Sequence, residues 1–181
     1  LAYRELIDSI RYISLGDECG VMGNIANIIT YKGRFYIQEE QFDRVFIYDD
    51  TGRCLKKIDN KGRGPGEYLR IESIDINTEK EELMLVDGMS DKLFFYDLGG
   101  NFKSIHSIRY FQTENTLCLR DSVFLHISAP SQNFGNEGLY GYALVLSKGN
   151  ENLSNLSIVT FHLMDVRKII THFLTSDLSI I

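Results

Sequence analysis

The sequence of 181 residues contains no tryptophan, four histidines and three cysteines. Without tryptophan, the chain lacks the indole platform on which many sugar-binding sites are built. No apolar run approaches the roughly 20 residues that a membrane-spanning helix needs. The histidines are too widely scattered to indicate a zinc site or a catalytic dyad; they are His106, His126, His162 and His172. These absences argue against a spanning helix and leave no catalytic constellation in view.

The three cysteines are an odd number, far apart and without the spacing of metal ligands. Cys54 and Cys118 fall in predicted strands, where a buried free thiol is the ordinary interpretation. A structural disulfide among the three cysteines, Cys19, Cys54 and Cys118, is the less favoured alternative. We predict no metal and no cofactor.

The charge balance is acidic, with 25 aspartates and glutamates against 19 lysines and arginines, a net charge of −6. Binding to a phosphate backbone depends on basic patches, so we expect no nucleic-acid partner. A hydrophobic content of 44% is enough to build a core. The chain starts at Leu1 with neither a methionine nor a signal sequence. We therefore expect a mature or trimmed form from which the targeting information has been removed.

The most informative feature that is present is an internal repeat. The heptapeptide FIYDDTG at residues 46–52 returns 48 residues later as FFYDLGG at residues 94–100. A fixed period of this length indicates one supersecondary unit stacked on copies of itself. In both copies a glycine closes the turn, at the position that needs a positive φ: Gly52 and Gly100.

Each copy reads as four short strands separated by turns. The predicted strands are 25–31, 34–37, 44–48 and 54–58 in the first copy and 71–76, 83–86, 92–96 and 102–108 in the second. A weaker third copy is traced through 116–119, 123–127 and 142–146. The third strand, 44–48, is apolar on both faces, which predicts that both faces are covered. The fourth strand carries Lys56 and Lys57, as an outer strand facing solvent would.

Four short strands per unit, a period near 48 and buried faces predict an all-β fold of four-stranded antiparallel β-propeller-type blades. A β-sandwich with two coincidentally similar halves is the alternative. We expect one partial propeller domain over 1–181, with units at about 21–68, 69–109 and 110–155. Since 181/48 gives fewer than four blades, either the chain is a fragment or a homodimer completes the ring. The atypical tail, 156–181, carries a helical stripe from Val166 to Leu174, which predicts a short helix or else an irregular segment.

The loop after the first unit reads Lys61-Gly62-Arg63-Gly64-Pro65-Gly66-Glu67-Tyr68. Three glycines and a proline in five positions force a compact turn. With the tyrosine-aspartate turn before it and the Ile-x-Ser-Ile-Asp-Ile strand after it, the loop resembles those of six-bladed β-propeller proteins of gut Bacteroidetes. That family is related to NHL-repeat propellers. The resemblance covers roughly residues 7–110.

The resemblance implies an exported protein of the periplasm or cell envelope, often a lipoprotein. It also implies that an N-terminal strand, here Ile10 to Leu15, completes the last blade. The chain departs from the family in being about half its usual length. It also ends the second strand with Gln38-Glu39, where relatives often have an aspartate.

Propeller topology would place the 61–70 loop on the same face as the turns between the second and third strands. This face is the candidate binding site. We assign ligand binding to Arg63, Glu67, Tyr68, Arg70, Glu39 and Asp87, and a structural role in the loop to Gly62, Gly64, Pro65 and Gly66. The alternative is that Glu67 only bonds backbone N–H groups of the loop, that Tyr68 packs between blades, and that Arg63 does no more than pair with Glu67 or Asp87. Phosphate cradling is disfavoured because no Gly-Lys-Ser/Thr follows.

Three functions stay open. The default is a non-catalytic binding or scaffold protein of the envelope that recognises a protein or glycan through this face. The second is an enzyme acting on a polysaccharide or small metabolite, with Glu67 and Asp87 as its acid–base pair. The third is a propeller stabilised by a calcium-like ion at Asp49, Asp50 and Asp97, although aspartate at a hairpin is ordinary turn chemistry. A cluster of exposed aromatics such as Tyr68 with Phe42 would favour binding.

Overall fold

The structure is a computed structural model that describes residues 9–107, 113–119, 123–128, 143–148 and 157–160. It is an all-β chain of three antiparallel four-stranded sheets, with no helix in these residues. The chain divides into two compact units, residues 1–60 and residues 61–181, which we describe separately. In the described part of the chain, no helix is long and apolar enough to cross a membrane.

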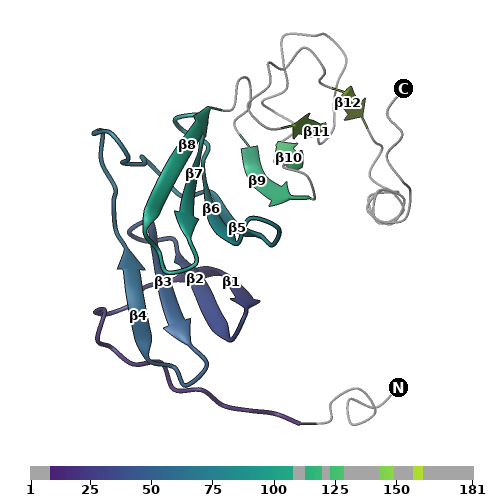
Figure 1. Cartoon of the computed structure of the whole chain (residues 1–181). Helices are drawn as coiled ribbons and strands as arrows, with labels where there is room; N and C mark the ends of the chain where they lie inside the picture. The colour runs from purple at the N-terminus through teal and green to yellow at the C-terminus, as the bar shows by residue number, and fades with distance from the viewer. Residues whose placement is uncertain (1–8, 108–112, 120–122, 129–142, 149–156, 161–181) are drawn as a thin grey trace. The chain divides into compact units, whose positions relative to one another are not determined.

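The first unit holds one sheet in the order β1-β2-β3-β4 (Figure 1). Its strands are β1 (Ile25–Tyr31), β2 (Arg34–Glu39), β3 (Arg44–Asp49) and β4 (Cys54–Ile58). A two-residue turn joins β1 to β2. Lys32 and Gly33 both have positive φ there, of 47° and 69°, which suits the twist of a tight hairpin. All four strands lie within two residues of their predicted bounds.

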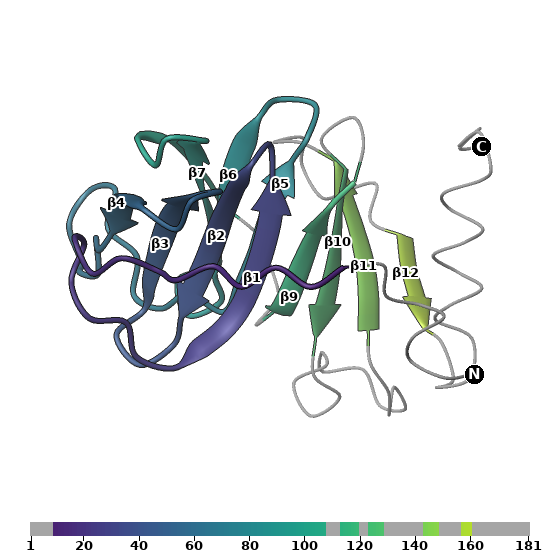
Figure 2. The ribbon, with the colours of Figure 1, turned by 90° about the horizontal axis from the view of Figure 1, so that it is seen from below.

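The second unit holds two sheets. The first has β5 (Ser73–Asn77), β6 (Glu82–Asp87), β7 (Lys92–Asp97) and β8 (Phe102–Ser107), in that order. The second has β9 (Thr113–Cys118), β10 (Val123–Ser128), β11 (Ala143–Lys148) and β12 (Ser157–Thr160), also in chain order. Strand β5 lies beside β9, as both ribbon views show (Figures 1 and 2).

The predicted repeat is confirmed at the level of backbone register. The pairing of β3 with β4 shifts between Ile47 and Tyr48, and that of β7 with β8 shifts between Phe95 and Tyr96. These irregularities are 48 residues apart, as are the glycines that follow them, Gly52 and Gly100, which have φ of 88° and 82°. The same turn and the same kink therefore build both sheets.

The third strand of each copy is buried on both faces, as its sequence predicts. Val45, Phe46, Ile47 and Tyr48 of β3 are at most 1% exposed, and residues 93–96 of β7 at most 3%. The outer strand β4 is more exposed, with Leu55 at 40%. The apolar core of the second unit gathers Met84, Val86, Leu93, Phe95 and Phe124, so it joins the two sheets of that unit.

One expectation about the cysteines needs correction, and the other is confirmed. Cys54 is not a free thiol: it forms a disulfide with Cys19, 35 residues away, while Cys118 on β9 is free. Strand propensity placed Cys54 correctly but could not show that the N-terminal segment returns to it. Burial, followed by the charge of Asp75, raises the pKa of the Cys118 thiol to about 12, which keeps it protonated at neutral pH.

Three further expectations differ from the structure or lie beyond it. Residues 10–15, expected as a strand, carry no regular secondary structure. Residues 157–160, expected in an atypical tail, form β12 and pair with β11. The β-branched pair at 158 and 159 suits a strand, but four residues are too few to show a pattern. The helix predicted over 166–174 lies outside the described residues.

Candidate functional site

The loop of residues 61–70 closes on itself through its backbone. Lys61 and Tyr68 form an isolated parallel bridge, and the Gly62 N–H donates to the Tyr68 carbonyl at 2.9 Å. The Glu67 N–H donates to the Gly64 carbonyl at 3.1 Å. Gly66 has a φ of 83°, a conformation that side chains disfavour. The glycines therefore have the structural role that the sequence predicts.

The Glu67 carboxylate turns back into this loop. Its Oε2 accepts a hydrogen bond from the Gly64 N–H at 2.7 Å. A Cβ atom added to Gly62 would lie 1.9 Å from the same oxygen, so the glycine leaves room for the carboxylate. Glu67 thus stabilises the turn that presents Arg63.

Tyr68 anchors the end of the loop in the core. Its side chain is fully buried, and its ring meets that of Phe94 edge to face, with centroids 6.0 Å apart. A ring buried in this way packs and does not contact a ligand. Phe42, its suggested aromatic partner, belongs to the other unit; it is 46% exposed and stacks under the Arg44 guanidinium, whose carbon is 4.6 Å from the ring centroid.

Asp87, at the end of β6, is 1% exposed and accepts four hydrogen bonds. Its Oδ2 accepts from the Leu69 N–H and the Ser90 hydroxyl, both at 2.7 Å. Its Oδ1 accepts from the N–H groups of Met89 and Ser90, both at 3.1 Å. One carboxylate therefore fixes both the 61–70 loop and the β6–β7 hairpin. Ser90 was not among the predicted site residues, although aspartate and serine are both typical turn residues.

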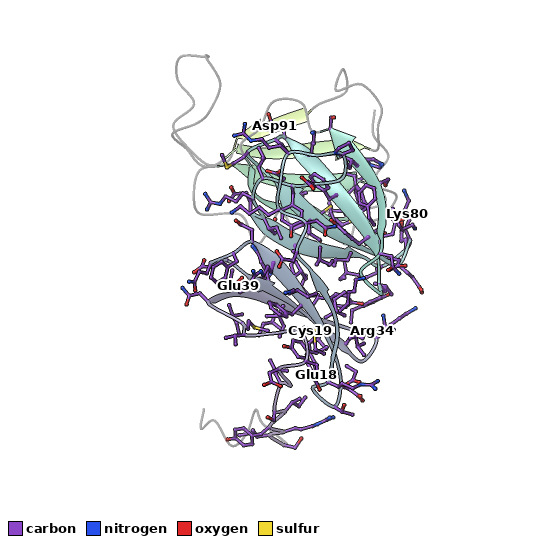
Figure 3. The ribbon with its side chains drawn as sticks, turned by 90° about the vertical axis from the view of Figure 1, so that its left-hand side faces the viewer. Glu18, Cys19, Arg34, Glu39, Lys80 and Asp91 are labelled. Carbon is purple, nitrogen blue, oxygen red and sulfur yellow. A yellow bond between two sulfur atoms is a disulfide. The ribbon has the colours of Figure 1, made fainter. Side chains whose placement is uncertain are left out.

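Glu39 holds the equivalent position in the first unit, 48 residues before Asp87. It is fully buried at the end of β2 (Figure 3), and its carboxylate oxygens accept from the N–H groups of Gln41 at 3.0 Å and Phe42 at 3.2 Å. A Cβ atom on Gly23 would lie 2.4 Å from Glu39 Oε1. The longer glutamate at this position thus caps its hairpin as the aspartate does.

Asp91 ends the turn before β7 and has a φ of 52° (Figure 3). Burial, followed by the negative charge of Asp87, raises the pKa of its carboxyl. Its Oδ1 is buried without a hydrogen-bond partner. The charge of Asp87 therefore makes ionisation of the Asp91 carboxyl less favourable.

The two arginines of the candidate set face solvent. Arg63 at the tip of the loop is exposed. The Arg70 side chain is 58% exposed, and its Nε lies 3.3 Å from Glu72 Oε1. Structure therefore divides the predicted residues into two groups. Glu39, Glu67 and Asp87 accept hydrogen bonds from backbone N–H groups and Tyr68 is buried in the core. The Arg63 and Arg70 side chains are exposed, and Glu67 is exposed with them.

Two of the three aspartates suggested for a calcium-like ion, Asp49 and Asp97, hold turns. Asp49 Oδ1 accepts from the N–H groups of Thr51 and Arg53, and Asp97 Oδ1 from those of Gly99 and Asn101. Among the described residues, no group of three or more histidine, cysteine or acidic side chains is placed to hold a metal ion.

The chain resembles proteins of Bacteroides. The sequence model of a domain of unknown function, DUF4934, matches residues 1–174. A crystal structure of a putative exported protein from Bacteroides fragilis is similar, with a TM-score of 0.67 and 19% identity over 85% of this chain. A member of the DUF4221 family from Bacteroides vulgatus has a TM-score of 0.51 and 9% identity over 78% of this chain. At these identities the likeness shows the fold alone.

This chain spans only 42% and 43% of the length of those two proteins. No curated protein matches it. The source of both structures agrees with the predicted resemblance to Bacteroidetes proteins. The NHL-like repeat and the six blades stay predictions.

Proposed function

We propose that this chain, which belongs to the DUF4934 family, is a non-catalytic binding protein of the bacterial cell envelope. It recognises a protein or a glycan through the surface that carries residues 61–70. The observation behind this proposal is the division of charge in the loop. Glu67 and Asp87 accept hydrogen bonds from backbone N–H groups, while Arg63 and Arg70 are exposed.

This division disfavours the enzyme alternative. A general acid or base must exchange a proton with a substrate within hydrogen-bonding reach. Each oxygen of Asp87 already accepts two hydrogen bonds, and the side chain is 1% exposed. The proposed partner, Glu67, is held by the Gly64 N–H. A rigid loop that positions side chains for binding fits these contacts better than an acid–base pair.

The exposed guanidiniums favour a ligand that carries carboxylates. A guanidinium matches a carboxylate with two parallel hydrogen bonds, which gives both affinity and orientation. The protein as a whole has a net charge of −6, whereas Arg63 and Arg70 are exposed cations of this loop, with Arg70 also within 3.3 Å of Glu72. The carboxylates could come from an acidic glycan or from an acidic polypeptide.

For the architecture, we propose that the three sheets are blades of a partial β-propeller. Three sequential four-stranded meanders and the repeated register shift support this interpretation. The blade-like units would be about 21–68, 69–109 and 110–155, extended to include β12. A homodimer could complete the ring.

For the location, we propose export to the periplasm or the cell envelope. Two observations support it. The Bacteroides fragilis protein with a similar fold is described as exported. The Cys19–Cys54 disulfide suits an oxidising compartment, because cytosolic thiols are kept reduced.

Affinity electrophoresis tests the binding function. The full chain is run in native gels that contain polygalacturonate, polyglutamate or neutral dextran. We expect retardation by one acidic polymer and not by dextran. The Arg63→Ala/Arg70→Ala variant should lose it, and Lys56→Ala/Lys80→Ala, which removes equal charge from exposed positions outside the loop, should keep it. Migration unchanged by both acidic polymers, or release of reducing ends from polygalacturonate, would count against the proposal.

A further inference from the structure

Residues 14–24, here called the strap, cross the sheet of the first unit without forming a strand. At one end, the Gly16 N–H donates to the Gly52 carbonyl at 2.8 Å, in the turn after β3. At the other end, the Asn24 carbonyl accepts from the Glu40 N–H at 3.0 Å, in the hairpin before β3. The strap therefore runs the length of β3 from one turn to the other.

The strap covers an apolar face of this sheet. Ile37, Phe46 and Tyr48 form a cluster in which no residue is more than 2% exposed. The Cys19 and Met22 side chains of the strap pack against this cluster. The strap thus supplies cover that the four strands do not provide for themselves.

Between its ends, the strap is fastened by one covalent bond. Cys19 forms a disulfide with Cys54 on β4 (Figure 3). Beside it, the Cys54 N–H donates to Glu18 Oε2 at 3.4 Å, and the Tyr48 hydroxyl donates to the Gly16 carbonyl at 3.2 Å. Both of these hydrogen bonds are long. Much of the strap faces solvent, with Val21 at 86% exposure.

Gly52 shows that close approach of the strap is built into the sequence. A Cβ atom at this position would lie 2.0 Å from the Ser14 carbonyl oxygen, which is backbone and cannot turn aside. Its counterpart Gly100 holds the same turn in the other unit, so the turn alone accounts for the positive φ. The contact with the strap is an additional requirement at Gly52.

We propose that the Cys19–Cys54 disulfide is a thiol-controlled latch for the strap. A dithiol reductant opens it: the two sulfurs of the disulfide gain two electrons and two protons, and the dithiol becomes a disulfide. The strap then leaves the sheet and uncovers Ile37, Phe46 and Tyr48. Cover over this face depends on oxidation, so the first unit completes its core only where the latch can form. This inference does not rest on the proposed binding function.

Hydrogen exchange tests the latch on the full chain, with and without a phosphine reductant. Reduction should speed exchange of the Gly16 and Glu40 amides by about tenfold or more. Their hydrogen bonds, from Gly16 to the Gly52 carbonyl and from Glu40 to the Asn24 carbonyl, are the ones that join the strap to the sheet. The β2–β3 amides, such as those of Tyr36 and Ile47, should keep their protection. Dye binding to exposed apolar surface should rise.

The Cys19→Ser/Cys54→Ser variant should reproduce the reduced state, and Cys118→Ser should behave like the oxidised wild type. Unchanged exchange at Gly16 and Glu40 after reduction would overturn the proposal, because the noncovalent contacts would then hold the strap alone. Equal acceleration across β2 and β3 would also overturn it, because the disulfide would then stabilise the sheet and not the strap. Reduction of the wild type gives this answer even if the serine variant does not fold.

Discussion

Asp49 and Asp97 organise equivalent turns with their carboxylates. Asp49 Oδ1 accepts from the N–H groups of Thr51 and Arg53, both at 3.0 Å, and from the Thr51 hydroxyl at 2.6 Å. Asp97 Oδ1 accepts from two N–H groups at 2.9 Å, and its Oδ2 accepts from the Asn101 amide. Hydrogen bonds to the ionised form lower the pKa of both carboxyls; for Asp49 the Thr51 hydroxyl is the largest cause.

The Asp49 turn should therefore lose its support in acid. The pKa of Asp49 falls from 3.8 to about 2. A lowered pKa means that the contribution is present above the unfolded value and is lost as pH falls through the folded one. We expect Asp49→Asn to lower the urea midpoint at pH 7 and to differ less from wild type at pH 2. Asp50→Asn serves as the control, and an equal difference at both pH values would contradict the account.

Asp87 and Asp91 should respond to substitution in opposite directions. Asp87→Ala strands the N–H groups of Leu69, Met89 and Ser90, so we expect it to reduce the free energy of unfolding by about 3 kcal/mol. Asp91→Asn removes a carboxyl group whose pKa is raised by burial and by the charge of Asp87. Asparagine also tolerates the positive φ at this position. We expect it to be neutral or stabilising by a few tenths of a kcal/mol. Urea denaturation of both variants measures this, and a stable Asp87→Ala would contradict it.

At the scale of elements, two side chains of β5 accept hydrogen bonds from backbone N–H groups on the edge of β9 that no described strand pairs with. The Ser73 hydroxyl accepts from the Thr116 N–H at 3.3 Å, and Asp75 Oδ2 accepts from the Cys118 N–H at 2.6 Å. Thr116 and Cys118 are two residues apart, so both N–H groups point to the same edge. Two side chains thus take the place of a pairing strand and join the two sheets of the second unit.

The contribution of Asp75 to stability should come from its oxygen as a hydrogen-bond acceptor and not from its negative charge. Burial raises the pKa of its carboxyl despite the Cys118 bond. A raised folded pKa means that the ionised form opposes folding, so stability rises as pH falls through that value. Asp75→Asn keeps an acceptor and should be at least as stable as wild type at pH 7. Asp75→Ala should lose about 1–2 kcal/mol. If Asn and Ala cost the same in thermal unfolding, the carboxylate bond is not what joins the strands.

The strands were predictable because their signals are local. The apolar run of β3 and the glycines that follow β3 and β7 sit in fixed places within the 48-residue repeat. The roles of the site residues were not predictable, because their partners are distant in sequence. Asp87 reaches the Leu69 N–H 18 residues away, and Cys19 reaches Cys54 across 35. No pattern in the sequence shows which carboxylates face backbone and which cations face solvent.

At the scale of the whole molecule, the edge of strand β1 favours association with another chain. Strand β1 ends its sheet, with Ile25 and Ile28 about half exposed and no proline or lysine along it. Apolar edge strands without such residues readily pair with other chains. A homodimer paired along this edge would differ from one that completes a propeller ring, in which blades pack face to face.

Solution mass measures this association. We expect light scattering on a sizing column to give about twice the monomer mass of 20.8 kDa. Ile28→Lys should shift the species toward monomer, because a charge on an edge strand opposes pairing. Lys56→Glu on β4 is the control and should leave the mass unchanged. A wild-type monomer at all concentrations would rule out completion of the ring by a second copy.

The central claim is that the 61–70 loop is a rigid binding site whose cations recognise carboxylates. Calorimetric titration with polygalacturonate and with polyglutamate tests it most directly. We predict that one of the two polymers binds the wild type. The Arg63→Ala/Arg70→Ala variant should raise Kd by about tenfold or more, whereas Lys56→Ala/Lys80→Ala should change Kd by less than about twofold. Equal losses in the two double variants would show that the attraction is only diffuse charge, and no binding of either polymer would contradict the claim outright.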